Sequence, residues 1–375
     1  MRVAMNEPGS PTRSILVIRL GAVGDVVRTL PAVSCLRRSF PSARIAWAVE
    51  EPSSGILEGH PDIDEILVLR RKVLVAALNL RGISGAITHL RAYTAALRER
   101  RFDWAVDFHG TIKSALLARW SGAPRRFGFG RDHAREHAHI LYTDTAPIPR
   151  ERMSRVTRAL RLVAHLGAEI SSPRIRLPVR EEASASARRF LDAEAPARPR
   201  TVICPGTSET QAYKRYPARL FARLADEVAA GTGGSVIIAW GPGEKETAEE
   251  VRRSMSRPSI LAPPTRLSEL AELTRQCDLF VGSDTGPLHI AAAVGVRIVG
   301  LYGPTSRTLN APYTDQPHLM FVGDVDCRPC RNRGCTNRSC LHLIDPVMVA
   351  RRAVDLLGTS MAGTPGLRGG SGSVP

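Results

Sequence analysis

Short apolar segments alternate with segments of helical pattern along the first half of the chain. The apolar segments read as buried strands at residues 14–20, 44–50, 65–69 and 103–108. The helical patterns lie between and after them, at residues 26–40, 92–102 and 111–122. Because this alternation places successive strands side by side in one direction, it predicts a doubly wound parallel α/β sheet.

The same alternation restarts after the middle of the chain. Residues 179–200 read as a helix followed by an Ala/Pro/Arg linker. The strands predicted beyond it are residues 201–206, 235–241, 259–263, 278–284 and 297–303. The helices predicted there are residues 218–233, 244–255, 267–277 and 286–295. The pattern therefore predicts a second α/β unit of similar size, with a domain boundary near residues 185–198.

The length and the two ends of the chain fit a two-domain organisation. A chain of 375 residues suggests two domains rather than one. We expect a flexible N-terminal extension at 1–13, domains at 14–190 and 191–358, and a disordered Gly/Ser/Pro-rich tail at 359–375. Two such domains enclose a central cleft, and ligands of these folds bind outside the carboxyl ends of the strands.

Composition and charge narrow the class of protein. With 43% hydrophobic and 23% charged residues, the chain has the composition of a soluble globular protein. No apolar run reaches the ~18 residues of a membrane span, and the first residues lack a signal-peptide core, so we expect a cytoplasmic protein. The net charge of +16 favours anionic partners: nucleic acid, phosphorylated small molecules or an anionic membrane. A solvated basic surface is the alternative.

The segment "LFVGSDTGPLH" at residues 279–289 contains the strongest candidate site. A predicted strand runs into Asp284, Thr285 and Gly286, and a helix follows. Gly286 lets the backbone approach a ligand closely, and the helix N-terminus can hold a phosphate. Asp284 would repel phosphate and suits sugar hydroxyl groups better. The alternative is a plain helix cap formed by Asp284 or Thr285.

A second candidate site follows the first predicted strand. Gly21 and Gly24 form a glycine turn without the G-x-G-x-x-G spacing of a dinucleotide-binding loop. Asp25 follows at once, where it would repel a phosphate at its own turn. Its negative charge therefore indicates a different ligand or chemistry, and capping of the helix at 26–40 is the alternative.

The two segments together resemble the heptosyltransferases of glycosyltransferase family 9. The resemblance rests on "GAVGDVVRTLPA" and "GSDTGPLHIAAA" and covers roughly residues 14–355. The stretches "WAVEEPSSGI", "DWAVDFHGTIKSALLAR" and "AREHAHILY" are most similar to the heptosyltransferase I branch. The resemblance implies the GT-B fold of two Rossmann-like domains, an ADP-L-glycero-D-manno-heptose donor, inversion at the anomeric carbon, a Kdo acceptor on lipid A, and no metal or other cofactor.

The resemblance also implies roles for residues in both domains. Asp25 matches the catalytic base, and Lys214 in "YKRYP" matches the lysine that neutralises the departing diphosphate. Glu244 matches the acid that binds ribose, with Glu246 as a near alternative. The donor-binding set is Thr207, Ser208, Lys214, Glu244, Asp284, Thr285, Gly286 and His289. For His289, as for His109 after the strand at 103–108, a core position is the alternative.

The acceptor implied by the resemblance is a phosphorylated lipid with acidic sugars. The N-terminal domain is then expected to carry cations near the cleft and to contact the cytoplasmic face of the inner membrane peripherally. The acceptor-binding candidates are Arg19, Gly24, Arg70, Arg71, Lys72, Lys113 and Arg135. Each charged residue alone is as well explained as ordinary surface charge.

Four cysteines near the C-terminus leave several alternatives open. Cys327, Cys330, Cys335 and Cys340 have the spacing C-x2-C-x4-C-x4-C, which fits a structural zinc site, packed reduced thiols or a disulfide. A reducing cytosol disfavours the disulfide. A zinc knuckle would allow a nucleic-acid-binding protein, which the low aromatic content of 5% disfavours. A transferase or epimerase of the same fold that uses another nucleotide sugar is the nearer alternative.

Overall fold

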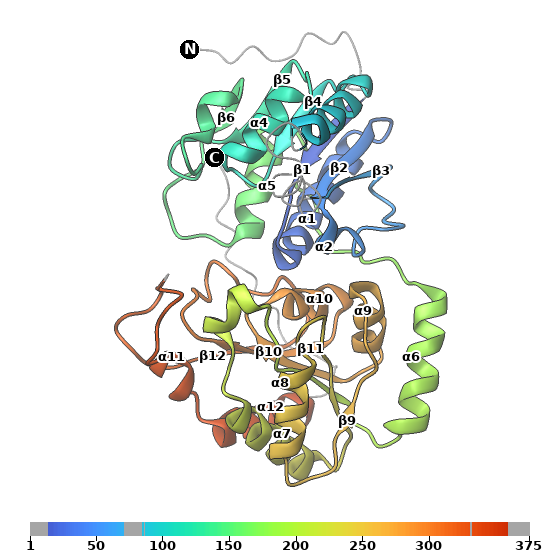
Figure 1. The fold of residues 1–375 in the computed structure, drawn as a ribbon, viewed down its shortest axis with the longest axis vertical. Helices are drawn as coiled ribbons and strands as arrows, with labels where there is room; N and C mark the ends of the chain where they lie inside the picture. Colours follow the sequence, from blue (N-terminus) through green and yellow to red (C-terminus); the bar gives the residue numbers. More distant parts are fainter. Residues whose placement is uncertain (1–13, 71–84, 86, 331, 359–375) are drawn as a thin grey trace.

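A computed structural model describes residues 14–70, 85, 87–330 and 332–358. The N-terminal domain contains one parallel sheet in the order β3-β2-β1-β4-β5-β6. Its strands are β1 (Ser14–Ile18), β2 (Arg44–Glu50), β3 (Glu65–Leu69), β4 (Trp104–Asp107), β5 (Arg125–Phe129) and β6 (Asp144–Ala146). Every neighbouring pair is parallel, which confirms the predicted doubly wound sheet. Figure 1 shows this domain in blue to green.

Helices cover this sheet because its strands are apolar on both faces. Every residue of β1 is buried, as expected for a central parallel strand. The helices and turns include α1 (Val23–Ser39), α2 (Glu51–Ser54), α4 (Ile112–Trp120), η1 (Ala138–Leu141) and α5 (Arg155–His165), and residues 87–99 are also helical. Helices α1 and α5 pack against each other, so the residues at the start of each come close together.

The C-terminal domain repeats the architecture with the sheet order β12-β11-β10-β7-β8-β9. Its strands are β7 (Thr201–Cys204), β8 (Val236–Ile238), β9 (Ile260–Leu261), β10 (Leu279–Ser283), β11 (Arg297–Tyr302) and β12 (His318–Val322). Its helices are α7 (Ala218–Thr232), α8 (Lys245–Ser254), α9 (Leu267–Arg275), α10 (Gly286–Val294), α11 (Ser339–His342) and α12 (Pro346–Gly358), with a 3₁₀ turn η2 (Glu209–Lys214). The predicted second α/β domain is present.

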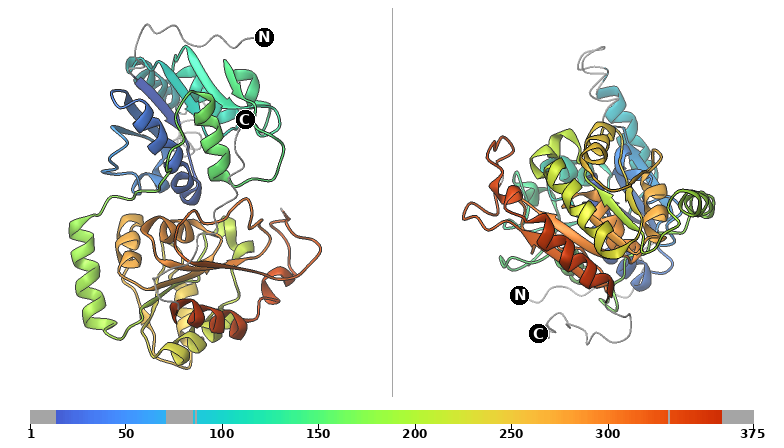
Figure 2. Two further views of the ribbon diagram at one scale, coloured as in Figure 1. Left: turned by 180° about the vertical axis from the view of Figure 1, so that it is seen from behind. Right: turned by 90° about the horizontal axis from the view of Figure 1, so that it is seen from below.

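Helix α6 (Glu181–Glu194) connects the two domains. It lies along the C-terminal domain in both views of the ribbon (Figures 1 and 2) and packs against α9. The side chain of Gln276 donates to the carbonyl of Ser184 at 2.9 Å. We therefore propose that the chain passes between the domains before Glu181, on the N-terminal side of the boundary predicted near residues 185–198.

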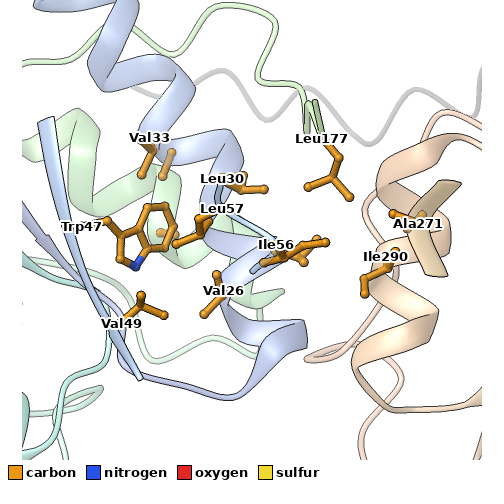
Figure 3. Packing of buried hydrophobic residues seen from close by; sticks show 14 of the residues in the cluster. Val26, Leu30, Val33, Trp47, Val49, Ile56, Leu57, Leu177, Ala271 and Ile290 are labelled. Carbon is orange, nitrogen blue, oxygen red and sulfur yellow. The ribbon is translucent and has the colours of Figure 1, made fainter. Parts of the chain in front are cut away.

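A continuous apolar cluster joins the two domains. It begins around Trp47 and Leu30 in the N-terminal domain and continues through Ile56 to Ala271 and Ile290 in the C-terminal domain (Figure 3). Helices α1 and α10 also pack against each other. The two domains are therefore in direct contact in this conformation. In the described parts of the chain, no helix has the length and apolarity needed to cross a membrane.

Replacing Leu30 with alanine tests the importance of this cluster. Leu30 is completely buried, so Leu30→Ala removes apolar contacts and leaves a cavity. We expect the free energy of unfolding to fall by about 2–5 kcal/mol, as measured by urea denaturation. Leu343→Ala is the matched control because that side chain is 60% exposed, and its cost should stay within about 0.5 kcal/mol. Equal losses in both variants would contradict the packing described here.

Candidate active site

The strand order of each sheet places a candidate ligand site at its switch point. The order reverses between β1 and β4 in the first sheet and between β7 and β10 in the second. In one domain, Asp25 lies in the first turn of the helix after β1 and His109 in the loop after β4; in the other, Thr207 and Asp284 lie in the loops after β7 and β10. Ligands of doubly wound folds bind at these positions, so the topology supports both candidate sites.

The N-termini of α1 and α10 meet where the two domains touch. A Cβ atom on Gly24 would lie 2.5 Å from Cδ2 of His289, so only glycine fits there without movement of the imidazole. A Cβ atom on Gly286 would lie 3.0 Å from Cβ of Val23. Gly24, predicted to bind the acceptor, and Gly286, predicted to bind the donor, therefore permit the close approach of the two helices. Their contacts with substrate stay predictions.

Three arginines surround the carboxylate of Asp25. Arg19 forms an ion pair with Oδ2, Arg28 lies 2.5 Å from Oδ1, and Nη1 of Arg155 lies 3.4 Å from Oδ1. Asp25 is the third residue of α1, and the helix cap is Ala22, without a side-chain hydrogen bond. The alternative that Asp25 caps this helix is therefore wrong.

The arginines keep Asp25 ionised over the whole physiological range. Burial alone would raise the pKa of this carboxyl group. The positive charges of Arg19, Arg28 and Arg155 outweigh burial and hold the pKa well below its ordinary value. The carboxylate is thus available to accept a proton, but its basicity is low while all three guanidinium groups contact it.

Asp284 is buried beneath the start of α10 and has partners from three segments. Its Oδ2 accepts a hydrogen bond from Nδ2 of Asn310 at 2.9 Å, and its Oδ1 lies 3.5 Å from Nε2 of His289. Nζ of Lys214 donates to its backbone carbonyl at 3.3 Å. These contacts place Lys214 beside Asp284, and its role toward a diphosphate stays a prediction.

The first turn of α10 has no side-chain cap. Thr285 occupies the cap position, but its hydroxyl donates to the carbonyl of Ser283 rather than accepting from the helix. Thr285 is therefore the cap residue by position but not by a side-chain hydrogen bond, and Asp284 is not the cap residue. The first N–H groups of α10 therefore keep their capacity to bind an anion.

A chain of hydrogen bonds connects the two candidate sites. Nη1 of Arg28 donates to Oδ1 of Asn310 at 2.9 Å, and Asn310 in turn donates to Asp284. Arg155 also donates to Oδ1 of Asn310, at 3.2 Å. Asp25 of the N-terminal domain and Asp284 of the C-terminal domain are thereby linked through one arginine and one asparagine.

The remaining predicted donor-binding residues lie in two neighbouring loops of the C-terminal domain. Thr207 is buried and accepts from Arg215, whereas Ser208 is exposed at the start of η2. Oε2 of Glu244 accepts the backbone N–H of Gly241 at 2.9 Å, and burial raises its pKa. A Cβ atom on Gly206 would clash with that carboxyl group, so the two loops are in contact. Glu246 is exposed.

The predicted acceptor-side cations do not all lie together. Arg19 is buried beside Asp25, and one of its guanidinium nitrogens donates to the carbonyl of Phe108. Arg70, Lys113 and Arg135 are exposed. The predicted residues Arg71 and Lys72 lie outside the residues that the structure describes. The binding of acceptor by this set stays a prediction.

His289 and His109 both lie at the site. His289 is buried, and its pKa is lowered to about 4 by burial and by the nearby charge of Arg28. His109 lies after β4, and burial together with the charge of Arg19 lowers its pKa to about 4. Both imidazoles are therefore neutral near pH 7. A buried position explains His289 as well as the predicted donor contact does.

The lowered pKa of His289 predicts a pH-dependent stability. Between about pH 6.5 and 4 the unfolded chain binds a proton at this residue and the folded chain does not, so stability falls as pH falls. The expected slope is about 1.4 kcal/mol per pH unit for one such histidine. His289→Gln should flatten this slope in urea denaturation measured between pH 7 and 4.5. An unchanged slope would show that His289 titrates normally.

The four clustered cysteines are free thiols. Cys327 is exposed, Cys330 and Cys335 are half-buried and Cys340 is buried. Over the described residues, no group of three or more His, Cys, Asp or Glu side chains is arranged to hold a metal ion. The structural zinc site and the packed reduced thiols both stay predictions.

Several residues of the site were missed from the sequence. Arg28 lies three positions after Asp25 on one helix, and this spacing is a signal that was overlooked. Arg155 and Asn310 come from distant segments without a motif, so no local signal identifies them. Arg158 on α5 joins Arg155 in the same pocket. These residues extend the candidate site beyond the two glycine-containing motifs.

Comparison with known proteins identifies heptosyltransferases as relatives of this chain, both by sequence and by structure. Residues 90–341 match the profile of glycosyltransferase family 9 (heptosyltransferase). Lipopolysaccharide heptosyltransferase 1 from Pseudomonas aeruginosa is 29% identical over 86% of this chain and 87% of its own length. Lipopolysaccharide heptosyltransferase 3 from Escherichia coli is 25% identical over 91% of this chain and 98% of its own length.

A solved structure extends the comparison to the fold. The heptosyltransferase WaaC from E. coli with ADP-2-deoxy-2-fluoro heptose matches with a TM-score of 0.70 and 22% identity, covering 91% of this chain and 99% of that one. The match confirms the predicted GT-B fold. Heptosyltransferases 1 and 3 are similar to the chain at comparable identity, so its assignment is to the family and not to the heptosyltransferase I branch. The chain is a glycosyltransferase and belongs to family 9, the heptosyltransferases.

Proposed function

We propose that the protein moves L-glycero-D-manno-heptose from its ADP derivative to Kdo in the inner core of lipopolysaccharide, with inversion. The observation that carries the proposal is the position of Asp25. It lies in the N-terminal domain and is joined through Arg28 and Asn310 to Asp284, beside Lys214. An inverting transfer needs a carboxylate on the acceptor side and a diphosphate site on the donor side.

The C-terminal domain supplies the donor side of this proposal. The first turn of α10 offers the N–H of Gly286 and a positive dipole end to the diphosphate, with Thr285 beside them. Lys214 adds a positive charge beside it, and Asp284 offers oxygens to heptose hydroxyl groups. In the same proposal Glu244 binds the ribose, and Thr207, Ser208 and His289 complete the donor contacts. The WaaC structure with an ADP-heptose analogue supports ADP as the nucleotide.

The transfer itself needs one proton acceptor and one stabilised leaving group. The acceptor hydroxyl loses its proton to Asp25 while its oxygen forms a bond to the anomeric carbon. The bond from that carbon to the diphosphate oxygen breaks on the opposite face, and ADP leaves with the electron pair. Lys214 and the start of α10 then balance the charge that develops on the diphosphate.

The acceptor is proposed to reach the site from a membrane surface. A Kdo-bearing lipid carries carboxylates and phosphates, and the net charge of +16 attracts anionic surfaces. We infer a peripheral position at the cytoplasmic face of the inner membrane, with Arg19, Gly24, Arg70, Lys113 and Arg135 on the acceptor side, together with Arg71 and Lys72.

A donor and acceptor screen with purified protein tests the proposal. ADP-heptose is compared with UDP- and GDP-sugars, and Kdo-lipid A is compared with an acceptor that already carries heptose. We expect transfer from ADP-heptose to Kdo-lipid A. Transfer to the heptosylated acceptor alone would assign the enzyme to a later step of core assembly. Transfer from a UDP- or GDP-sugar alone would refute ADP-heptose as the donor.

A further inference from the structure

The pocket beside Asp25 has a large excess of positive charge. Its lining contains four arginines and one carboxylate. These are Arg19, Arg28, Arg155, Arg158 and Asp25. Several guanidinium groups near one another repel unless anions lie between them, so this cluster of arginines attracts a further anion besides Asp25.

The three arginines that contact Asp25 are held differently. Arg19 and Arg28 have side chains exposed by only 7% and 8%, and each also donates to a backbone carbonyl, of Phe108 or Gly24. Arg155 is 30% exposed and lies farther from the carboxylate, 3.4 Å from Oδ1. Besides Asp25, its guanidinium group donates to a side chain, Oδ1 of Asn310, at 3.2 Å. Arg155 is therefore the member of the set that a ligand can withdraw most easily.

Arg158 is positioned to receive the same ligand as Arg155. The two side chains are three positions apart on α5, so they lie on one face of the helix. The guanidinium group of Arg158 lies over the ring of Phe129, 5.2 Å from its centroid. In the described ranges, no carboxylate lies within ion-pairing distance of it, and burial together with the charge of Arg155 lowers its pKa to about 10. An anion between Arg155 and Arg158 would supply the missing partner.

We propose that Arg155 restrains Asp25 in the resting enzyme, and that an anionic group of the acceptor releases Asp25 by binding Arg155 and Arg158. The ligand class is a carboxylate or phosphate group with at least two oxygens, which guanidinium groups bind in a bidentate manner. Arg155 and Arg158 are positioning residues, because they act on the reaction through Asp25. The inference rests on the proposed function, since it concerns the acceptor side of the same reaction.

Withdrawal of Arg155 changes the chemistry of Asp25 in the required direction. Removing one positive charge from a carboxylate raises its affinity for a proton, so Asp25 becomes a stronger base when the acceptor is bound. The proton that it accepts comes from the attacking hydroxyl group of that acceptor. The enzyme would thus keep a weak base until an anionic acceptor is in place. Acceptors without the anion would bind and still react slowly.

Several other groups contribute to the electrostatic environment of Asp25, and any pH profile reflects all of them. They are Arg19 after β1, Arg28 on α1, Arg155 and Arg158 on α5, His109 after β4, Lys214 in η2 and His289 on α10. Both histidines have a pKa lowered to about 4, so they stay neutral across the range used below.

The test compares Arg155→Met and Arg158→Met with wild type at saturating ADP-heptose, between pH 5 and 9. The acceptors are Kdo-lipid A, its Kdo carboxyl methyl ester and a dephosphorylated form. Wild type should prefer the anionic acceptor over the matching neutral one by about tenfold in kcat, and Arg155→Met should lose most of that preference. A lower kcat with the methyl ester would identify the Kdo carboxylate as the ligand of Arg155 and Arg158. A lower kcat with the dephosphorylated acceptor would identify a phosphate group instead.

Arg155→Met should also raise kcat with the neutral acceptors toward the wild-type value for the anionic one, because Asp25 then lacks a neighbouring positive charge whichever acceptor is bound. Arg158→Met leaves the ion pairs of Asp25 intact and removes one of the two groups that hold the anion, so it should lower kcat with the anionic acceptor and should not raise kcat with the neutral ones. If Arg155→Met does not fold, Arg158→Met still tests whether the anion of the acceptor binds at these two arginines. Arg161→Met, on the same helix and outside the pocket, is the matched control and should behave as wild type.

The outcomes separate this inference from the proposed function. No transfer by wild type would overturn both. Transfer by wild type, with the same preference for the anionic acceptor in Arg155→Met as in wild type, would overturn the release of Asp25 and leave the proposed function standing. Loss of preference in Arg155→Met, together with wild-type behaviour of Arg161→Met, would support the inference.

Discussion

Asp25→Asn should lower kcat by about 10²–10⁴-fold while the protein stays folded. The amide has nearly the shape of the carboxylate but cannot accept the proton of the attacking hydroxyl group. Donor affinity should not weaken, because Asp25 is a negative charge and its loss leaves Arg19, Arg28 and Arg155 free to attract ADP. The measurements are steady-state transfer from ADP-heptose to Kdo-lipid A and calorimetric titration with ADP.

The same substitution has a cost in stability that must be separated from its effect on catalysis. Without the carboxylate, three guanidinium groups remain close together in a partly buried site, and we expect a loss of about 3 kcal/mol. Asp25→Glu keeps the charge and should retain most of the stability. Asp192→Asn, which removes an exposed partner of Arg200, should leave both properties unchanged. A folded Asp25→Asn variant with kcat within tenfold of wild type would refute Asp25 as the base.

The sequence was most informative where strands are buried on both faces. Such strands appear as continuous apolar runs, and β1, β2, β7 and β10 were all predicted in this way. Strand β5 was missed because it begins with Arg125 and Arg126 and contains a glycine, so it lacks the apolar signal. Strands β6 and β12 lie at the edges of their sheets. Strand β6, "DTA", has only three residues, and every residue of β12, "HLMFV", is half-buried. The apolar pattern identified neither strand.

Sequence patterns identified only part of the candidate active site as well. Asp25 and Asp284 lie next to glycines at strand ends, and those local patterns identified both. The residues that set their environment come from elsewhere: Asn310 is 282 positions from Arg28, and Arg155 is 130 positions from Asp25. No spacing rule connects segments so distant. Their proximity depends on the order of strands and on the contact between domains, which only the structure provides.

Lys214→Met is expected to have the second largest effect on transfer. Nζ of Lys214 lies 3.3 Å from the backbone carbonyl of Asp284 and 3.9 Å from its Oδ2. It therefore lies at the start of α10, where the proposal places the diphosphate. Burial lowers the pKa of this amine, although the charge of Asp284 opposes that shift. Removing a positive group from a water-poor site should lower kcat by about 10²–10³-fold.

The distribution of this loss between kcat and KM distinguishes two roles for Lys214. If the lysine mainly stabilises charge that develops as ADP leaves, kcat falls and the KM for ADP-heptose changes little. If it only holds the bound donor, KM rises and kcat is preserved, which would refute its role toward the leaving group. Lys214→Arg retains the positive charge and should recover part of the rate. Lys245→Met removes an exposed lysine that pairs with Glu249 and should change neither constant.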